Sequence, residues 1–215
     1  MDYCFLNKNE TKNKNLILIF NGWGMNEDAF KHLSSKDCDV LILSDYRKID
    51  INLIDFDLKQ YCKKYLIAWS MGVYISGFFK DIIDKFDKKI AINGTQCIID
   101  DNFGIPEKIY DFTIKNFNET SKEKFIENMF KGAKIKPEFT VQRDLKSLKD
   151  ELISIKNLKP QEKISFDKAV ISDFDRIIPP KNQYKYWENK TKILKIKSAH
   201  CPFYDYNSFE EILCN

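Results

Sequence analysis

One serine lies in a local pattern that suits nucleophilic chemistry. Strand-forming residues 65–69 lead into Ser70, and a helix-like stretch, residues 73–79, leads out of it. A serine held on a sharp turn between a buried strand and a helix exposes its hydroxyl, and small residues two positions away let neighbouring chains pass. Ala68 and Gly72 are those small residues here. The pattern alone is not specific, because a serine between small residues is often only a turn.

A serine hydroxyl is a weak nucleophile that needs a base, and the base needs an acid to orient it. His200 follows the last strand-like run and suits the base, whereas His32 lies in a predicted helix and is interpreted as a surface or partly buried residue. The acid is expected in the loop after residues 169–171, where both Asp173 and Asp175 occur. Loop position leaves the choice open; we favour Asp175 and keep Asp173 as the alternative.

The oxyanion that forms on attack needs two hydrogen-bond donors. The backbone N–H of Met71, at the start of the helix that follows the serine, is the first candidate. The second is expected from the Asn-Gly-Trp-Gly loop, residues 21–24, which follows the apolar run 16–20. We predict the backbone N–H of Trp23 as this donor, with its indole forming a wall of the pocket. The alternative is that the two glycines only make a turn.

Short runs rich in Ile, Leu and Val recur along the chain, with polar turns between them. Continuous apolar runs of this kind are typical of parallel strands that are covered on both faces. Helix-like segments fall between several of them, one after Asn26 and another from the serine turn toward Phe86, so the sequence predicts an α/β fold with a mainly parallel sheet. The predicted strands are residues 16–20, 40–43, 66–69, 90–92, 169–171 and 193–196.

Between residues 96 and 163 the strand-like runs stop and amphipathic helices take over. We expect this segment to form a helical cap over the C-terminal edge of the sheet, inserted before the last two strands, because α/β proteins bind ligands at that edge. The expected division is a core of residues 1–95 and 164–215 with a cap of residues 96–163, within one structural domain.

Three cap helices are predicted. Pro106 suits a first helical turn, and Thr120 with Glu123 suits a capping box for a second helix that ends at Gly132. Leucines at three- and four-residue spacing mark the third. The residues expected to share a face are Ile105, Ile109 and Phe112 on the first helix, Phe125, Ile126, Met129 and Phe130 on the second, and Leu145, Leu148, Leu152 and Ile155 on the third.

The composition is that of a globular protein, with 43% hydrophobic and 31% charged residues among 215. A formal net charge of +3 is too small to indicate a nucleic-acid partner. No apolar run approaches the roughly 20 residues that cross a bilayer, and the first residues lack a secretory signal, so we expect a cytoplasmic protein. Six cysteines without C-x-x-C or metal-ligand spacing predict reduced thiols, most of them buried, and no metal site.

The order Ser70, Asp175, His200 is the chain order of α/β-hydrolases. Four segments together resemble the pimeloyl-acyl-carrier-protein methyl ester esterases of biotin synthesis, with the BioG type the nearer match and BioH more distant. Departures from the wider hydrolase pattern are Asn21 where histidine is common, Ala68 for the first glycine, and Val73 after Gly72. The segments that carry the resemblance are residues 20–25 (Phe-Asn-Gly-Trp-Gly-Met), 69–73 (Trp-Ser-Met-Gly-Val), 175–179 (Asp-Arg-Ile-Ile-Pro) and 199–203 (Ala-His-Cys-Pro-Phe).

The resemblance implies hydrolysis of the methyl ester of pimeloyl-acyl-carrier protein to methanol and the free carboxylate, without a metal or organic cofactor. It puts the nucleophile on Ser70, the acid on Asp175, the base on His200, and the oxyanion donors on Trp23 and Met71. Two alternatives stay open: a general carboxylesterase or thioesterase with the same triad, and a binding module that has lost turnover. Cap phenylalanines are expected mainly to pack, with some lining an acyl-chain channel; the substrate-binding candidates are Trp23, Phe112, Phe125 and Phe130.

We expect the protein to be a monomer. Because a carrier protein is acidic, its docking surface on the enzyme is expected to be basic. Residues 108–149 contain ten Lys and Arg against six Asp and Glu. The alternative is that these charges only form a solvated, lysine-rich surface. The docking candidates are Lys122, Lys124, Lys131, Lys134, Arg143, Lys146 and Lys149.

Overall fold

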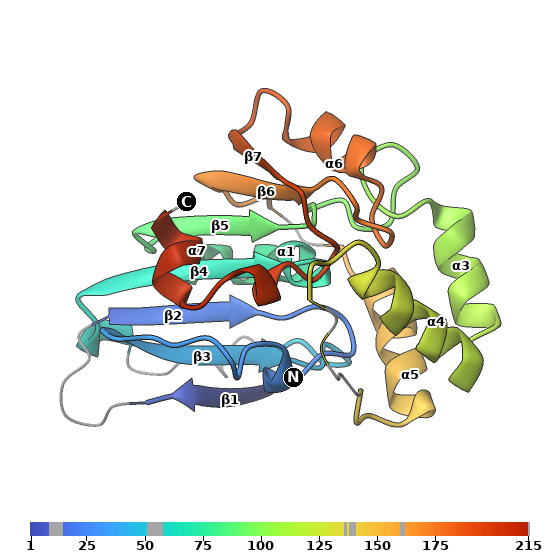
Figure 1. The fold of residues 1–215 in the computed structure, drawn as a ribbon, viewed down its shortest axis with the longest axis horizontal. Coiled ribbons are helices and arrows are strands. Elements are labelled where there is room, and N and C mark those ends of the chain that lie inside the picture. Colours follow the sequence, from blue (N-terminus) through green and yellow to red (C-terminus); the bar gives the residue numbers. More distant parts are fainter. Residues whose placement is uncertain (9–14, 51–57, 136, 138–140, 160–161, 215) are drawn as a thin grey trace.

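The protein is described by a computed structural model that covers residues 1–8, 15–50, 58–135, 137, 141–159 and 162–214. In these residues the strands form one seven-stranded sheet, in the order β1-β3-β2-β4-β5-β6-β7 (Figure 1). Every neighbouring pair is parallel except β1 and β3. The strands are β1 (Asp2–Asn7), β2 (Asn15–Phe20), β3 (Cys38–Ser44), β4 (Lys63–Trp69), β5 (Lys88–Ile92), β6 (Lys168–Ser172) and β7 (Lys192–Ile196).

The six predicted strands are all present, and the α/β fold class with a mainly parallel sheet is confirmed. Leu16 to Phe20 of β2 and Leu66 to Trp69 of β4 have no exposed area at all, as expected for strands covered on both faces. The antiparallel edge strand β1 was not predicted. Its side chains are mostly exposed or half-buried, Tyr3 among them, so its sequence carries no burial pattern.

Helices cover both faces of the sheet. In Figure 1, α1 (Met71–Ile75) lies behind the sheet and α7 (Phe209–Cys214) lies in front of it. The helix predicted from the serine turn toward Phe86 is broken into α1, a 3-10 segment and α2 (Lys80–Ile83). Asn26 does cap a helical segment, accepting the N–H of Asp28, but only a short 3-10 turn follows it. The remaining helix of the core is α6 (Pro180–Trp187).

Three helices fall between β5 and β6: α3 (Glu107–Lys115), α4 (Glu119–Phe130) and α5 (Leu145–Lys156). They lie together beyond the end of the sheet to which the arrows of β2, β4, β5 and β6 point (Figure 1). This is the edge over which the sequence predicted the cap. The limits of core and cap at residues 95/96 and 163/164 stay a prediction.

The ends of the cap helices differ from the prediction. Pro106 is the residue before α3 rather than part of its first turn, with extended backbone. The capping box of α4 consists of Asn118 and Ser121, whose side chains each accept the backbone N–H of the other. Thr120 lies inside this helix, so the predicted box with Glu123 is wrong by two residues; asparagine caps a helix as well as threonine does.

The apolar faces of the cap are partly as predicted. On α5, Leu148, Leu152 and Ile155 are buried. On α3, Ile109 and Phe112 line one cavity together with the preceding Ile105, as expected for residues that share a face. That face is not packed on the core, because Ile109 and Phe112 are 57% and 66% exposed while Tyr110 is buried. Helical spacing alone does not distinguish a face that packs on the core from one that lines an opening.

The six cysteines all lie in the described residues and are free thiols. The expectation that most are buried is wrong: Cys38 and Cys201 are buried, Cys97 is half-buried, and Cys4, Cys62 and Cys214 are exposed. Within the described segments, no helix has the length and apolar character that a bilayer crossing requires. Nor do three or more His, Cys, Asp or Glu side chains of these segments gather in a way that suits a metal ion.

Candidate active site

Ser70 occupies a strained turn between β4 and α1. Its backbone has φ 55° and ψ −121°, a conformation that residues other than glycine adopt rarely. The crossing chains leave no room for a side chain two residues later, because a Cβ at Gly72 would lie 2.1 Å from the carbonyl oxygen of Phe20. The close passage of β2 beside α1 therefore requires glycine at position 72, and the tight turn presents the serine side chain at the sheet edge.

The three predicted side chains meet at this edge. His200 Nε2 lies 2.9 Å from Ser70 Oγ, and His200 Nδ1 lies 2.8 Å from Asp175 Oδ2. All three residues are buried, with exposures of 7%, 5% and 1% for Ser70, Asp175 and His200. Asp173, the alternative acid, is exposed and accepts a hydrogen bond from the Tyr184 hydroxyl instead. The geometry is therefore that of a nucleophile, a base and an orienting acid.

The carboxylate of Asp175 is held in one orientation. Its Oδ1 accepts the backbone N–H groups of Ile177 and Ile178 at 2.8 and 2.9 Å. Its Oδ2 also accepts the side-chain N–H of Gln183 at 2.8 Å. Gln183 was not predicted, because it lies on α6, eight residues from the acid, and nothing in its sequence neighbourhood distinguishes it.

The loop of His200 is fixed mainly by Asn93, which directly follows β5. The Asn93 amide donates to the carbonyl oxygen of His200 at 2.8 Å, and its Oδ1 accepts the backbone N–H of Ser172. Trp69 Nε1 donates to the same His200 carbonyl at 2.9 Å. Asn93 therefore links the ends of β5 and β6 to the loop after β7. This role was not predicted, although Asn-Gly after a strand is a recognisable turn.

The predicted oxyanion residues lie beside the serine. Trp23 and Met71 line one cavity together with Ser70. The Asn21 side chain, where other hydrolases have histidine, accepts the N–H of Gly22 at 2.8 Å and donates to the Asn26 carbonyl at 2.9 Å. Asn21 therefore stabilises the turn of the loop that carries Trp23.

The cavity has a volume of about 300 Å³ and is walled mainly by the cap. Phe112 and Phe125, two of the substrate-binding candidates, line it. Phe130 does not; it is buried, with its ring edge against Tyr204. The predicted packing residue Phe139 lies outside the described residues. The other apolar and aromatic side chains of the lining are Ile105, Ile109, Tyr110, Leu152 and Ile177, and its remaining polar side chains are Thr113, Asn116, Ser121, Lys124, Asn128 and Arg176.

The docking candidates are in different environments. Lys124 is exposed at the cavity, and Lys146 is 86% exposed although it contacts Asp150. Lys122 is paired with Glu119 and its side chain is only 18% exposed. Arg143 points into the protein, with its guanidinium against Glu151 and Asp45. Of the remaining candidates, Lys131 and Lys134 are exposed and Lys149 is half-buried.

Comparison with known proteins identifies the family. A family model described as "Pimeloyl-ACP methyl esterase BioG" matches residues 2–212. The chain belongs to this family. The crystal structure of BioG from Haemophilus influenzae is similar to it with a TM-score of 0.85 and 32% identity, and the match covers 98% of this chain and 99% of that one.

Two curated relatives match over 198 residues each. A Bacteroides fragilis protein named malonyl-[acyl-carrier protein] O-methyltransferase is 37% identical, and the match covers 87% of this chain but only 39% of that protein. An uncharacterised Haemophilus influenzae protein is 35% identical, with 88% of this chain and 90% of that one covered. The enol-lactonase of Burkholderia xenovorans, with a TM-score of 0.67 and 11% identity over 93% and 89% of the two chains, shares the α/β-hydrolase fold with this BioG chain.

Proposed function

We propose that this BioG chain is a serine esterase that hydrolyses the methyl ester of pimeloyl-acyl-carrier protein to the free carboxylate and methanol, in biotin biosynthesis. The observation that carries the proposal is that Ser70, His200 and Asp175 are linked by two hydrogen bonds, and that Ser70 lines a mainly apolar cavity. Membership of the BioG family supports the choice of substrate.

In the first half of the reaction, Ser70 Oγ attacks the ester carbonyl carbon while its proton passes to His200 Nε2. Asp175 accepts from Nδ1–H and so keeps Nε2 aimed at the serine. The oxyanion accepts the backbone N–H groups of Trp23 and Met71. When the tetrahedral intermediate collapses, His200 returns the proton to the departing methoxide, and methanol leaves an acyl-enzyme.

In the second half, a water molecule attacks the acyl-enzyme carbonyl while His200 takes one of its protons. The C–O bond to Ser70 then breaks, the serine oxygen regains the proton from His200, and the carboxylic acid is released. Each proton has a donor and an acceptor among the two side chains, the leaving methoxide and water. The residues present are therefore sufficient for ester hydrolysis without a metal or organic cofactor.

The substrate assignment fits the cavity and one of the relatives. An apolar lining that includes Ile109, Phe112 and Phe125 suits the methylene chain of a dicarboxylic acyl group. The Bacteroides relative is named for placing a methyl group on a carrier-bound acid. A carboxylate masked in this way needs an esterase to free it, which is the reaction proposed here.

Docking of the carrier is assigned to the exposed lysines of the cap. Lys124 lies at the cavity and Lys146 is 86% exposed, so both are accessible to an acidic partner. Lys122 is less available to an acidic partner, because its ammonium group is already paired with Glu119 at 2.6 Å. We propose transient, electrostatically steered docking, which affects the rate of encounter more than the chemical step.

The test compares two substrates and two variants. The wild-type chain, Ser70→Ala and the control Ser76→Ala are each assayed with pimeloyl-carrier methyl ester and with a short p-nitrophenyl ester. The Ser76 hydroxyl is buried and donates to the Val73 carbonyl at 2.9 Å. We expect the carrier-bound ester to have the higher kcat/KM and Ser70→Ala to lower kcat by at least about 10⁴-fold. A preference for the short ester would favour a general carboxylesterase, and cleavage of the thioester instead of the methyl ester would favour a thioesterase.

A further inference from the structure

The loop that carries Trp23 is held in place by hydrogen bonds to two separate parts of the molecule, the turn after β3 and helix α5. The Tyr46 hydroxyl lies 2.9 Å from the carbonyl oxygen of Asn21 and 3.1 Å from that of Leu43. The Trp23 indole N–H donates to the carbonyl oxygen of Leu148 at 3.0 Å. Tyr46 belongs to the turn after β3, and Leu148 belongs to α5 of the cap. The position of this loop therefore depends on how α5 sits against the Tyr46 turn.

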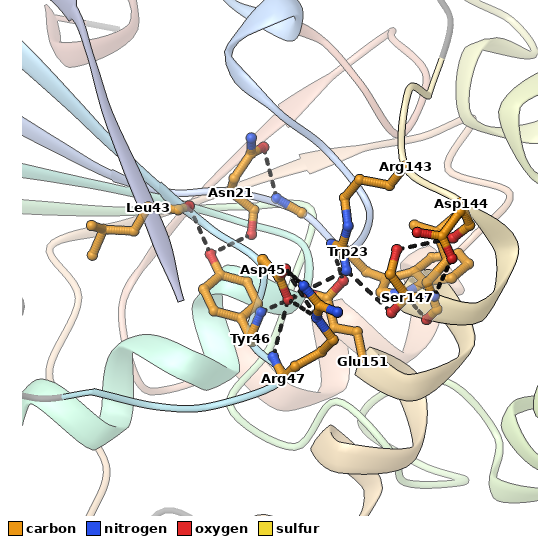
Figure 2. A network of polar contacts seen from close by, with 12 residues as sticks. Asn21, Trp23, Leu43, Asp45, Tyr46, Arg47, Arg143, Asp144, Ser147 and Glu151 are labelled. Atoms are coloured by element: carbon orange, nitrogen blue, oxygen red, sulfur yellow. Dashed lines mark hydrogen bonds and ion pairs between the residues drawn. The ribbon is translucent and has the colours of Figure 1, made fainter.

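Glu151 joins these two supports. Its Oε1 accepts the backbone N–H of Tyr46 at 2.8 Å, and its Oε2 lies 2.6 Å from Arg143 Nη1. Glu151 is three residues beyond Leu148, on the next turn of the same helix. Figure 2 shows the Arg143 guanidinium and the Glu151 carboxylate converging on the Tyr46 turn. One stretch of α5 therefore holds both Tyr46 and the Trp23 indole.

Two further charges complete the cluster. Arg143 Nη2 donates to the Ser147 carbonyl at 3.1 Å and lies 3.3 Å from Asp45 Oδ1. Arg47 Nε donates to the same carboxylate at 2.8 Å. The side chains are 0%, 5% and 19% exposed for Glu151, Asp45 and Arg143, and 45% for Arg47. Two carboxylates and two guanidinium groups thus form a charge-balanced cluster in which Glu151, Asp45 and Arg143 are largely shielded from water and Arg47 is exposed.

The cluster also has the features of a site under constraint. Burial raises the pKa of Glu151, although Arg143 opposes the shift. Asp45 has φ 56°, a left-handed conformation that aspartate adopts more readily than most residues. Arg47 and Arg143 contact its carboxylate and hold the side chain in place.

We propose that Glu151 and Arg143 are positioning residues for ester hydrolysis: they lock α5 against the Tyr46 turn and so keep the backbone N–H of Trp23 where the oxyanion forms. The inference rests on the proposed function. It assigns Arg143 a role inside the protein, in place of the carrier-docking role that its sequence context predicted.

The first test removes one buried charge and keeps the shape. Glu151→Gln retains an acceptor for the Tyr46 N–H but loses the carboxylate opposite Arg143. The matched control is Asp150→Asn, the same chemical change one residue earlier on the same helix, at a side chain that is 43% exposed. With a short p-nitrophenyl ester we expect Glu151→Gln to lower kcat about 10- to 100-fold with KM within about threefold, because a misplaced donor acts on the transition state. Asp150→Asn is expected to leave kcat and KM within about twofold of the wild-type values.

Turnover is expressed per competent site, counted by the end point of Ser70 labelling with a fluorophosphonate. A purely structural loss would lower the number of labelled sites and leave kcat per site unchanged. That result would overturn the proposal. If Glu151→Gln does not fold, the double variant Glu151→Met with Arg143→Met replaces the whole pair by apolar groups, a change that buried ion pairs often tolerate. Low kcat per site in the folded double variant supports positioning, and normal kcat contradicts it.

Arg143→Gln separates positioning from docking. Positioning predicts equal losses on the short ester and on the carrier-bound ester, with no change in salt dependence. A loss confined to the carrier-bound ester would return Arg143 to docking and overturn the proposal. Absence of ester hydrolysis by the wild-type chain would count against the proposed function itself, whereas normal turnover in Glu151→Gln and Arg143→Gln would count against this inference alone.

Discussion

The sheet edge and the cap contribute to the same cavity in different ways. At the sheet edge, Ser70, Asp175 and His200 are at most 7% exposed, and core residues fix the acid and the loop of the base. In the cap, Ile109 and Phe112 line the cavity and are more than half exposed. The chemistry therefore depends on a rigid edge, while the cap keeps apolar area uncovered for a molecule that enters from solvent.

Many contacts join the two regions, and three of them are hydrogen bonds that lie close to the catalytic loops. The Trp23 indole donates to Leu148, Glu151 accepts from Tyr46, and the Cys201 N–H next to the base donates to the Met129 carbonyl at the end of α4. These contacts end at Trp23 itself, at Tyr46, which supports the Trp23 loop, and at the residue after the base. A change in the cap can therefore reach the chemistry through them, which makes the comparison testable.

The largest effect is expected at the rigid edge. Asp175→Asn keeps the size of the acid but removes the charge that stabilises the protonated base, and we expect kcat to fall by about 10⁴-fold. The matched control is Asp173→Asn, two residues earlier, whose carboxylate contacts only the Tyr184 hydroxyl among the described side chains. Its kcat should stay within about twofold of wild type. Steady-state kinetics on a short ester decide; equal losses in both variants would contradict the choice of Asp175.

The next effect tests whether a buried cap residue is structural. Phe130 is 4% exposed and does not line the cavity. Phe130→Ala should lower the free energy of unfolding by about 3–5 kcal/mol, because it leaves a cavity in packed surroundings. Urea unfolding measures this loss. At temperatures where the variant is folded, its KM for the carrier-bound ester should match wild type; a raised KM would restore Phe130 as a substrate-binding residue.

The rigid edge could be predicted because it follows from strand ends. Ser70, Asp175 and His200 each come shortly after an apolar run, and the carboxyl ends of parallel strands meet at one edge. The residues that support them could not be predicted in the same way. Asn93 and Gln183 act through amide contacts to groups brought near only by folding. No local spacing encodes such contacts.

The cap was predicted less well for a related reason. Ile109 and Phe112 have the helical spacing of packing residues, but the face they form turns to the opening. Glu151 lies in the leucine stripe of α5, where a charge on an otherwise amphipathic helix is normally solvated. The backbone N–H of Tyr46, which Glu151 accepts, is more than a hundred residues away in sequence. Periodicity predicts that a helix has a buried face but not what that face meets.

A smaller effect is expected at the charged surface of the cap. Raising the ionic strength from about 0.01 to about 0.15 M shortens the screening length from about 30 to about 8 Å. We expect kcat/KM on the carrier-bound ester to fall about tenfold over this range, because steered encounters weaken with salt. The kcat/KM on the short ester should change by less than about twofold over the same range, because this substrate has no carrier protein to dock. Lys124→Ala should reduce the salt effect, whereas Lys85→Ala, three residues before the start of β5 and at the other end of the sheet, should not. Equal salt effects on both substrates would remove the docking proposal.

The smallest effect separates contact with substrate from folding. Phe112 is 66% exposed, so Phe112→Ala should change the free energy of unfolding by no more than about 0.5 kcal/mol. If the ring covers the acyl chain of the bound substrate, its loss removes roughly 1 kcal/mol of apolar contact, and KM for the carrier-bound ester should rise by a few-fold. Ile153→Ala is the control, because Ile153 is 42% exposed on α5 and does not line the cavity. Identical KM values for the two variants would mean that the exposed face of α3 does not meet the substrate, and the cap would then act mainly through the contacts that hold Trp23.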